Sequence, residues 1–175
     1  MKVITVIGAS AAGKTFLSQA YHNKHKTIPF YRFDTIGVPS TEVMIKEYGS
    51  GEEWQHQKTI EWMNKIVAEN KGVEWVLFEG QTRPQFVNDA YKKANLKDSF
   101  IICLWCNVQT MQKRLIQQRQ QPELFNDTMI NWSNLLRKWS EECSNAVVVD
   151  TSGDETDLNI AKLTSAINDI MTKKM

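Results

Sequence analysis

Residues 8–15, Gly-Ala-Ser-Ala-Ala-Gly-Lys-Thr, are the stretch that most constrains how this chain folds. They match the phosphate-binding pattern G-x-x-x-x-G-K-[ST] at every defined position. The apolar, β-branched run 2–7 before them is typical of a buried strand, and residues 16–21 after them suit a helix. Because strand, glycine-containing loop and helix are the structural context of the pattern, the sequence predicts a site for a nucleoside triphosphate.

The defined positions of the pattern each have a physical role. Gly8 lets the chain turn sharply off the strand, and Gly13 lets the backbone approach a phosphate without an intervening Cβ. The loop amides then form an anion-binding nest at the positive end of the helix. We expect Lys14 to contact the β- and γ-phosphates of ATP and the Thr15 hydroxyl to hold Mg²⁺. The residues expected to bind the nucleotide in this loop are Gly8, Ala9, Ser10, Ala11, Ala12, Gly13, Lys14 and Thr15.

The rest of the chain alternates between strand and helix patterns. Further strands are predicted at 30–34, 73–78, 100–106 and 146–150. Helices are predicted at about 40–47, 52–70, 84–94, 108–119, 129–143 and 160–170. Alternation of this kind predicts an α/β fold, a three-layer sandwich in which helices cover both faces of a five-stranded parallel sheet. Ligands of such sheets bind at the carboxyl ends of the strands.

Two acids follow strands at this edge of the predicted sheet. A carboxylate at Asp34 is suited to accept the proton of a substrate hydroxyl or to hold a water on Mg²⁺, and the alternative is a loop cap. Glu79 follows an almost wholly apolar strand, where an acid is costly without a purpose or partner. Its options are Mg²⁺-water coordination, substrate contact, or an ion pair with Arg83. Gly80 gives a substrate room near the backbone, and Arg83 is suited to clamp a phosphate or carboxylate.

Arginines flank the segment around the Gln-Pro break at 120–122. Arg114, Arg119 and Arg137 are candidates to close over a triphosphate and neutralise the charge of the transferred phosphoryl group. The alternative is that they are solvated helix charges. The stripe of Met129, Trp132, Leu136, Trp139 and Cys143 is interpreted as core packing.

Composition limits the remaining possibilities. A length of 175 residues suits one domain, and the net charge of +1 does not suggest a nucleic-acid partner. The sequence has no apolar run of membrane-spanning length, and its start enters the first strand directly, so we expect a cytoplasmic protein. Cys103 and Cys106 form a C-x-x-C pair inside a strand pattern, and we interpret them as buried free thiols. His22 and His25 are interpreted as surface residues.

These features together resemble the small P-loop kinases of the adenylate, shikimate and gluconate kinase superfamily. The resemblance covers the phosphate loop, Asp34, Glu79-Gly80-Gln81-x-Arg83, Arg114-x-x-x-x-Arg119 and Thr151-Ser152-Gly153. It implies the strand order 2-3-1-4-5, a helical substrate-binding insert at about 40–70 and a short lid at about 114–137.

The resemblance also implies roles for individual residues. Arg114 stacks on adenine, and Arg119 and Arg137 contact phosphates. The implied catalytic residues are Lys14, Asp34 and Arg119. The implied substrate-binding residues are Asp34, Glu79, Gly80, Gln81, Arg83 and Arg137. The implied metal-site residues are Thr15, Asp34 and Glu79.

The sequence therefore predicts an ATP- and Mg²⁺-dependent kinase, monomeric or homodimeric, that acts on a small hydroxyl- or phosphate-bearing metabolite. The first alternative is a nucleotide-binding regulatory module without turnover, whose exposed tryptophans bind a partner. A small GTPase is suggested only by Asp34-Thr35-Ile36-Gly37, which spells D-x-x-G, while the guanine-reading motif is absent. A polynucleotide 5′-hydroxyl kinase needs a basic groove that the net charge does not suggest. The residues from Asp34 to Arg83, which we expect to select the acceptor, match no one family.

Overall fold

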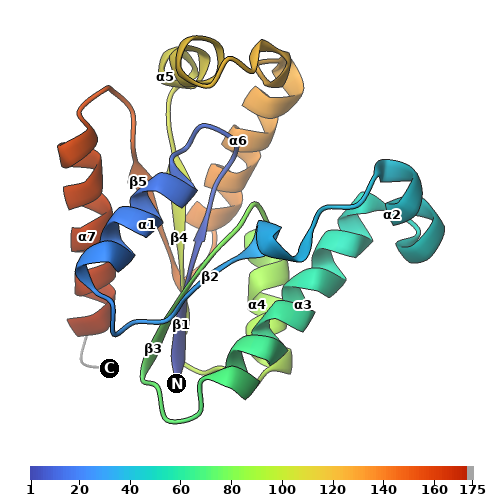
Figure 1. Ribbon diagram of the computed structural model, residues 1–175, viewed down its shortest axis with the longest axis vertical. Helices are drawn as coiled ribbons and strands as arrows, with labels where there is room; N and C mark the ends of the chain where they lie inside the picture. Colours follow the sequence, from blue (N-terminus) through green and yellow to red (C-terminus); the bar gives the residue numbers. More distant parts are fainter. Residues whose placement is uncertain (173–175) are drawn as a thin grey trace.

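The computed structural model describes residues 1–172 and contains a parallel sheet between two layers of helices (Figure 1). Its strands run in the order β2-β3-β1-β4-β5, and every neighbouring pair is parallel. They are β1 (Lys2–Ile7), β2 (Phe30–Arg32), β3 (Trp75–Glu79), β4 (Phe100–Trp105) and β5 (Ala146–Asp150). The predicted α/β sandwich and its strand order are therefore confirmed.

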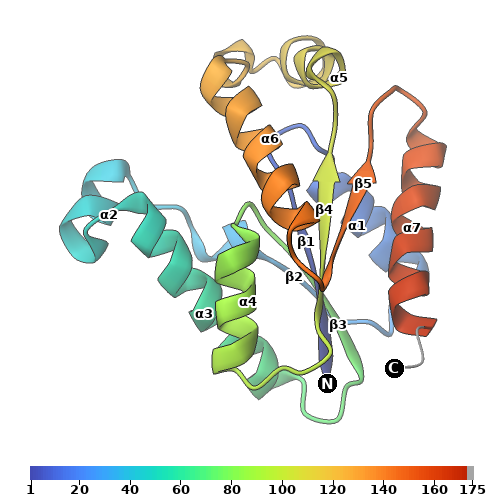
Figure 2. The ribbon, with the colours of Figure 1, turned by 180° about the vertical axis from the view of Figure 1, so that it is seen from behind.

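Helices cover both faces of this sheet. The helices α1 (Lys14–Lys24) and α7 (Thr156–Thr172) lie on one face (Figure 1). The opposite face carries α3 (Gly51–Glu69), α4 (Pro84–Lys93) and α6 (Asp127–Glu141) (Figure 2). The shorter helices are α2 (Thr41–Tyr48), α5 (Val108–Gln112), the 3-10 helices Phe33–Ile36 and Pro122–Leu124, and the π-helix Lys113–Gln118. No helix within residues 1–172 combines the length and the apolarity that crossing a membrane requires.

The two faces of the sheet explain the nearly continuous apolar strands. On β1, Val3 and Ile7 pack with the cluster that contains Trp62 of α3, whereas Ile4 and Val6 pack with the cluster that contains Leu17 of α1. Because alternate residues of a strand point to opposite faces, both sets must be apolar. The middle of each strand is therefore buried by helices on both faces of the sheet. Polar side chains occur where the strands end.

The predicted aromatic stripe packs as expected on α6, but Cys143, its last member, lies beyond the end of this helix and is only partly buried. Leu136 is fully buried, and Met129, Trp132 and Trp139 pack against the same core cluster. Cys103 and Cys106 are buried and free, which confirms the interpretation of the C-x-x-C pair.

Three predicted strands differ in their bounds, and the one predicted at 100–106 ends at Trp105. The strand predicted at 30–34 ends at Arg32, and Asp34 lies in the 3-10 helix Phe33–Ile36. This turn is held by the Thr35 hydroxyl, which donates to the Arg32 carbonyl at 2.7 Å, and by the amide of Gly37, which donates to the Asp34 carbonyl at 3.2 Å. The strand predicted at 73–78 is Trp75–Glu79, so Glu79 belongs to the sheet itself.

The helix predicted at 108–119 is α-helical only as far as Gln112. From Lys113 it widens into a π-helix, in which the amide of Arg119 donates to the carbonyl of Arg114 at 2.9 Å. Hydrogen bonds between residues five apart define this conformation, which is rare and frequently found at functional sites. The change affects the segment that carries two of the predicted site arginines.

Candidate active site

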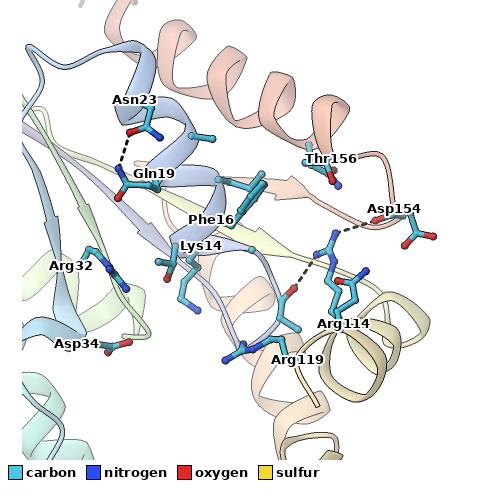
Figure 3. Close-up of a pocket in the computed structure, with 18 residues that line it drawn as sticks. Lys14, Phe16, Gln19, Asn23, Arg32, Asp34, Arg114, Arg119, Asp154 and Thr156 are labelled. Carbon is cyan, nitrogen blue, oxygen red and sulfur yellow. Dashed lines mark hydrogen bonds between the residues drawn. The ribbon is translucent and has the colours of Figure 1, made fainter. Parts of the chain in front are cut away.

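A cavity of about 920 Å³ lies beside the phosphate loop at the carboxyl end of the sheet (Figure 3). Side chains from β2 and the 3-10 helix after it face the cavity on one side, and the π-helix and the loop after β5 face it on the other. Its lining residues that the sequence analysis had selected are Ala11, Gly13, Lys14, Thr15, Asp34, Arg114 and Arg119. The cavity therefore contains part of the predicted site and leaves part of it outside.

The loop between β1 and α1 has the backbone of an anion-binding nest. Gly8 adopts φ +152°, and a Cβ there would lie 2.4 Å from the carbonyl oxygen of Leu104. Ala11 and Gly13 adopt left-handed conformations with φ +68° and +91°. Within residues 1–172, the amides of residues 10, 11 and 13–16 donate no hydrogen bond. A row of unpaired amides at a helix N-terminus is well suited to bind phosphate oxygens.

Lys14 places a positive charge beside these amides. Its Nζ donates to the carbonyl of Ala9 at 3.0 Å, so the side chain lies along the loop. Burial lowers the pKa of Lys14, while the neighbouring carboxylates of Glu79 and Asp34 raise it and Arg119 lowers it again. A cation that is poorly solvated and faces another cation favours binding of an anion between them.

A hydrogen bond joins Thr15, at the start of α1, to Glu79, at the end of β3. The Thr15 hydroxyl donates to Oε1 of Glu79 at 3.1 Å, and Nε of Arg32 donates to the same oxygen at 3.3 Å. Glu79 is 2% exposed. The ion pair with Arg83, one of the three options for Glu79, is not formed, because the parallel register of β2 and β3 places Arg32 directly opposite Glu79.

Asp34 lies in the cavity as an exposed side chain. In Figure 3 its carboxylate is beneath Arg32 and faces the same space as Lys14. Arg119 approaches this space from the opposite side. The carboxylate of Asp34 therefore lines the same cavity as the cations Lys14 and Arg119.

The π-helix and the residue directly after it each present a predicted arginine to the cavity. Arg114 bridges two loops: Nη1 donates to the carbonyl of Ala11 at 2.9 Å, and Nη2 donates to the carbonyls of Thr151 and Gly153 at 2.7 and 3.0 Å. The guanidinium of Arg119 makes no hydrogen bond within residues 1–172 and lines the cavity. Arg114 lies in the π-helix and Arg119 directly follows it, and the backbone hydrogen bond between them spans five residues.

Two predicted substrate arginines do not line the cavity. Arg83 donates to Gln55 and Glu52 of α3, at 3.0 Å in both cases, and lies over the ring of Trp132. Arg137 donates to Glu141 at 2.8 Å and lies over the ring of Trp105. Both guanidinium groups therefore have structural partners on neighbouring elements.

Gly80 and Gln81 are also absent from the cavity lining. A Cβ on Gly80 would lie 2.5 Å from Cβ of Phe33. The absent side chain therefore makes room for Phe33, and not for a substrate as we had expected. The carbonyl of Gln81 accepts a hydrogen bond from the Gln55 side chain at 2.7 Å.

Solved structures of similar shape were found at low sequence identity. A shikimate kinase from Acinetobacter baumannii, in complex with shikimate, matches with a TM-score of 0.61 and 14% identity over 99% of this chain and 96% of its own. A sugar kinase from Janibacter sp. HTCC2649 matches with a TM-score of 0.67 and 14% identity over 96% and 95%. A deoxyadenosine kinase from M. mycoides with bound dATP matches with 0.60 and 17% over 95% and 99%.

The chain has the P-loop kinase fold. The resemblance inferred from the sequence is thus confirmed at the level of the fold, and the individual member stays open. No protein-family model matches the chain, and no curated protein sequence matches it either.

Within this P-loop kinase fold, the donor set suits Mg²⁺ held mainly by its substrate. Thr15, Glu79 and Asp34 supply hard oxygen ligands of the type that Mg²⁺ prefers. No cluster of three or more His, Cys, Asp or Glu side chains within residues 1–172 has the arrangement of a complete protein metal site. Mg²⁺ characteristically uses one or two protein ligands together with substrate phosphates and waters, so these residues fit it.

The cavity residues that the sequence did not reveal include Arg32, Phe16 and Asn159. Arg32 and Phe16 face the cavity, and Phe16 is 59% exposed (Figure 3). Asn159 of α7 is 3% exposed, lines the cavity and donates to the carbonyl of Thr151 at 3.2 Å. Only Arg32 left a signal in the sequence, as a charged residue within an aromatic strand pattern two positions before Asp34.

Proposed function

We propose that this protein is a kinase that transfers the γ-phosphoryl group of ATP to a small metabolite in the presence of Mg²⁺. One observation carries the proposal: the unpaired amides of the phosphate loop, Lys14 and Arg119 face a single cavity in a kinase fold. Phosphoryl transfer depends on positioning and positive charge more than on covalent catalysis, so this arrangement is sufficient for it.

The geometry of the cavity supports the following binding roles. The loop amides and Lys14 bind the β- and γ-phosphates, and Arg119 approaches the transferred group from the opposite side (Figure 3). Arg114 connects the phosphate loop to residues 151–153 and so borders the end of the cavity that is suited to the adenine of ATP. Thr15 and Glu79 hold Mg²⁺, which when bound neutralises phosphate charge and orients the triphosphate.

Asp34 is the proposed base when the acceptor group is a hydroxyl. Its carboxylate takes the hydroxyl proton, the acceptor oxygen forms a bond to the γ-phosphorus, and the bond from that phosphorus to the bridging oxygen breaks to release ADP. Glu79 is less suited to this role, because it is buried and already accepts from Thr15 and Arg32.

The regulatory alternative relied on exposed tryptophans. Trp54, Trp62 and Trp75 are buried, and the other three are partly buried. The tryptophans therefore give no particular support to a partner-binding module.

The proposal is tested by measuring ADP release with Mg²⁺ across nucleosides, nucleotides, sugars, sugar acids and shikimate-like acids. One acceptor should stimulate ADP release. Arg119→Met should lower kcat for it by roughly 10³-fold, the range known for catalytic arginines in this chemistry. Lys93→Met, which removes a cation of α4 paired with Asp89 at 3.0 Å, is the matched control and should leave kcat unchanged. Acceptor-independent ATP hydrolysis that Arg119→Met does not change would contradict the proposal.

A further inference from the structure

Arg32 is held at the carboxyl end of β2 by one side of its guanidinium. Its Nε donates to Glu79 Oε1 at 3.3 Å, and Glu79 is buried while the Arg32 side chain is 44% exposed. The ion pair links the two strands at paired positions of the register. A guanidinium anchored through Nε has a defined orientation, with its two terminal nitrogens directed away from the anchor.

Those terminal nitrogens are free to bind a ligand. Within residues 1–172, Nη1 and Nη2 of Arg32 donate to no protein group. Arg32 lines the cavity, and Figure 3 shows its guanidinium above the carboxylate of Asp34. The planar fork of an arginine matches the two oxygens of a carboxylate or phosphate group.

The other arginines are occupied or lie elsewhere. Arg83 and Arg137 are paired with Glu52 and Glu141 outside the cavity, and Arg114 is hydrogen-bonded to loop carbonyls. Arg119 directly follows the π-helix and lies across the cavity from Arg32 (Figure 3). Arg32 is therefore the free guanidinium that the described residues offer on the side of Asp34.

We propose that Arg32 binds an anionic group of the phosphoryl acceptor while Asp34 receives the proton of its hydroxyl. The acceptor is then a hydroxyl compound that also carries a carboxylate or a phosphate, and not a neutral nucleoside, sugar or polyol. The inference rests on the proposed function, because it assigns the second substrate of the same cavity. Arg32 serves this substrate rather than ATP because it lies on the β2 side of Lys14, away from Arg114 and residues 153–159 (Figure 3).

Thermal unfolding in saturating Mg·AMP-PNP tests the inference without requiring that the natural acceptor be known. The probes are sulfate, as a generic anion, and the matched pairs gluconate and glucitol, glycerate and glycerol, and shikimate and its methyl ester. We expect sulfate and at least one carboxylate to raise the unfolding midpoint of the wild type, and the neutral partner not to. Arg32→Met should abolish this increment while the increment from Mg·AMP-PNP alone is retained.

Two further variants keep the result interpretable. Arg32→Met leaves Glu79 buried without its cation, so the double variant Arg32→Met/Glu79→Gln removes both charges and should fold. Because Glu79 is also a proposed Mg²⁺ ligand, the double variant is compared with Glu79→Gln alone, which should retain the anion increment that the double variant lacks. Lys93→Met, which also removes one ion-paired surface cation, should retain the increment.

Three results would overturn the inference: an increment that Arg32→Met retains, a neutral compound as effective as its anionic partner, or no response of the wild type to any anion. A wild type that does not respond to Mg·AMP-PNP at all would instead refute the proposed function.

Discussion

The positive charge of Lys14 lowers the free energy of unfolding. Burial lowers its pKa despite the nearby carboxylates of Glu79 and Asp34, which means that the ammonium is less stable here than in water. A group whose folded pKa lies below its ordinary value of 10.5 destabilises the protein throughout the pH range in which both folded and unfolded forms are protonated. That cost disappears as the pH rises from the folded pKa to the ordinary one.

Replacing Lys14 by methionine therefore separates stability from binding. At pH 7, Lys14→Met should unfold at a temperature equal to or higher than the wild type. The advantage should shrink as the pH approaches 10.5, because the wild-type lysine then loses its proton in the folded state. Thermal unfolding at a series of pH values measures this, and a variant much less stable at pH 7 would show that the ammonium stabilises the loop.

Gly8 and Gly153 allow the effect of backbone strain to be separated from the effect of a steric clash. Both have positive φ, +152° and +90°, but a Cβ on Gly8 meets the Leu104 carbonyl at 2.4 Å whereas the space beside Gly153 is open. Gly153→Ala should cost about 1–2 kcal/mol of unfolding free energy from backbone strain alone. Gly8→Ala adds a clash with backbone and should cost roughly 2 kcal/mol more. Chemical denaturation measures both, and equal costs would contradict this explanation of the first glycine.

At the scale of elements, the π-helix Lys113–Gln118 determines where the arginines point. Its hydrogen bond between Arg119 and Arg114 spans five residues, so both side chains reach one cavity. Segments of this kind tend to occur at functional sites, where the extra residue redirects a side chain. The sequence pattern predicts an uninterrupted helix here and does not indicate the change to π geometry at Lys113.

Deleting Gln117, an exposed residue of this segment, should restore α-helical geometry and turn Arg119 away from the cavity. We expect kcat to fall by at least about 100-fold, the typical cost of losing one group that stabilises the transition state. The substitution Gln117→Ala, which keeps the chain length, should leave kcat within about twofold, since surface changes away from special features have small effects. Comparable activity of the deletion and the substitution would mean that the π-helix does not position Arg119.

Sheet register explains which site residues the sequence could reveal. The phosphate loop was predictable because its function resides in eight consecutive residues between one strand and one helix. The partner of Glu79 was not, because Arg32 meets it only through the register of β2 against β3. Arg83 has the correct residue type and lies near Glu79 in sequence, yet helix α3 supplies its partners. Contacts between distant elements depend on packing that no single segment specifies.

For the whole molecule, the parallel sheet brings the separate site segments to one edge. The phosphate loop follows β1, Asp34 follows β2, Glu79 ends β3 and Thr151 follows β5. The strand order places β1 at the centre, with β3 and β4 on either side. The central strand therefore places the phosphate loop in the middle of the cavity. The side proposed for the acceptor is next to β2, and the side proposed for the adenine of ATP is next to β5.

Titration calorimetry of the purified protein with Mg·ATP tests the central claim most directly, because it requires no knowledge of the acceptor. The wild type should bind one equivalent with a Kd of about 1 μM–1 mM, the usual range of enzyme substrates. Lys14→Met should bind about 10- to 150-fold more weakly, since the contact of a charged group with phosphate contributes about 1.5–3 kcal/mol. A wild type that does not bind Mg·ATP, or a Lys14→Met variant that binds it equally well, would contradict the assignment of this cavity to the nucleotide.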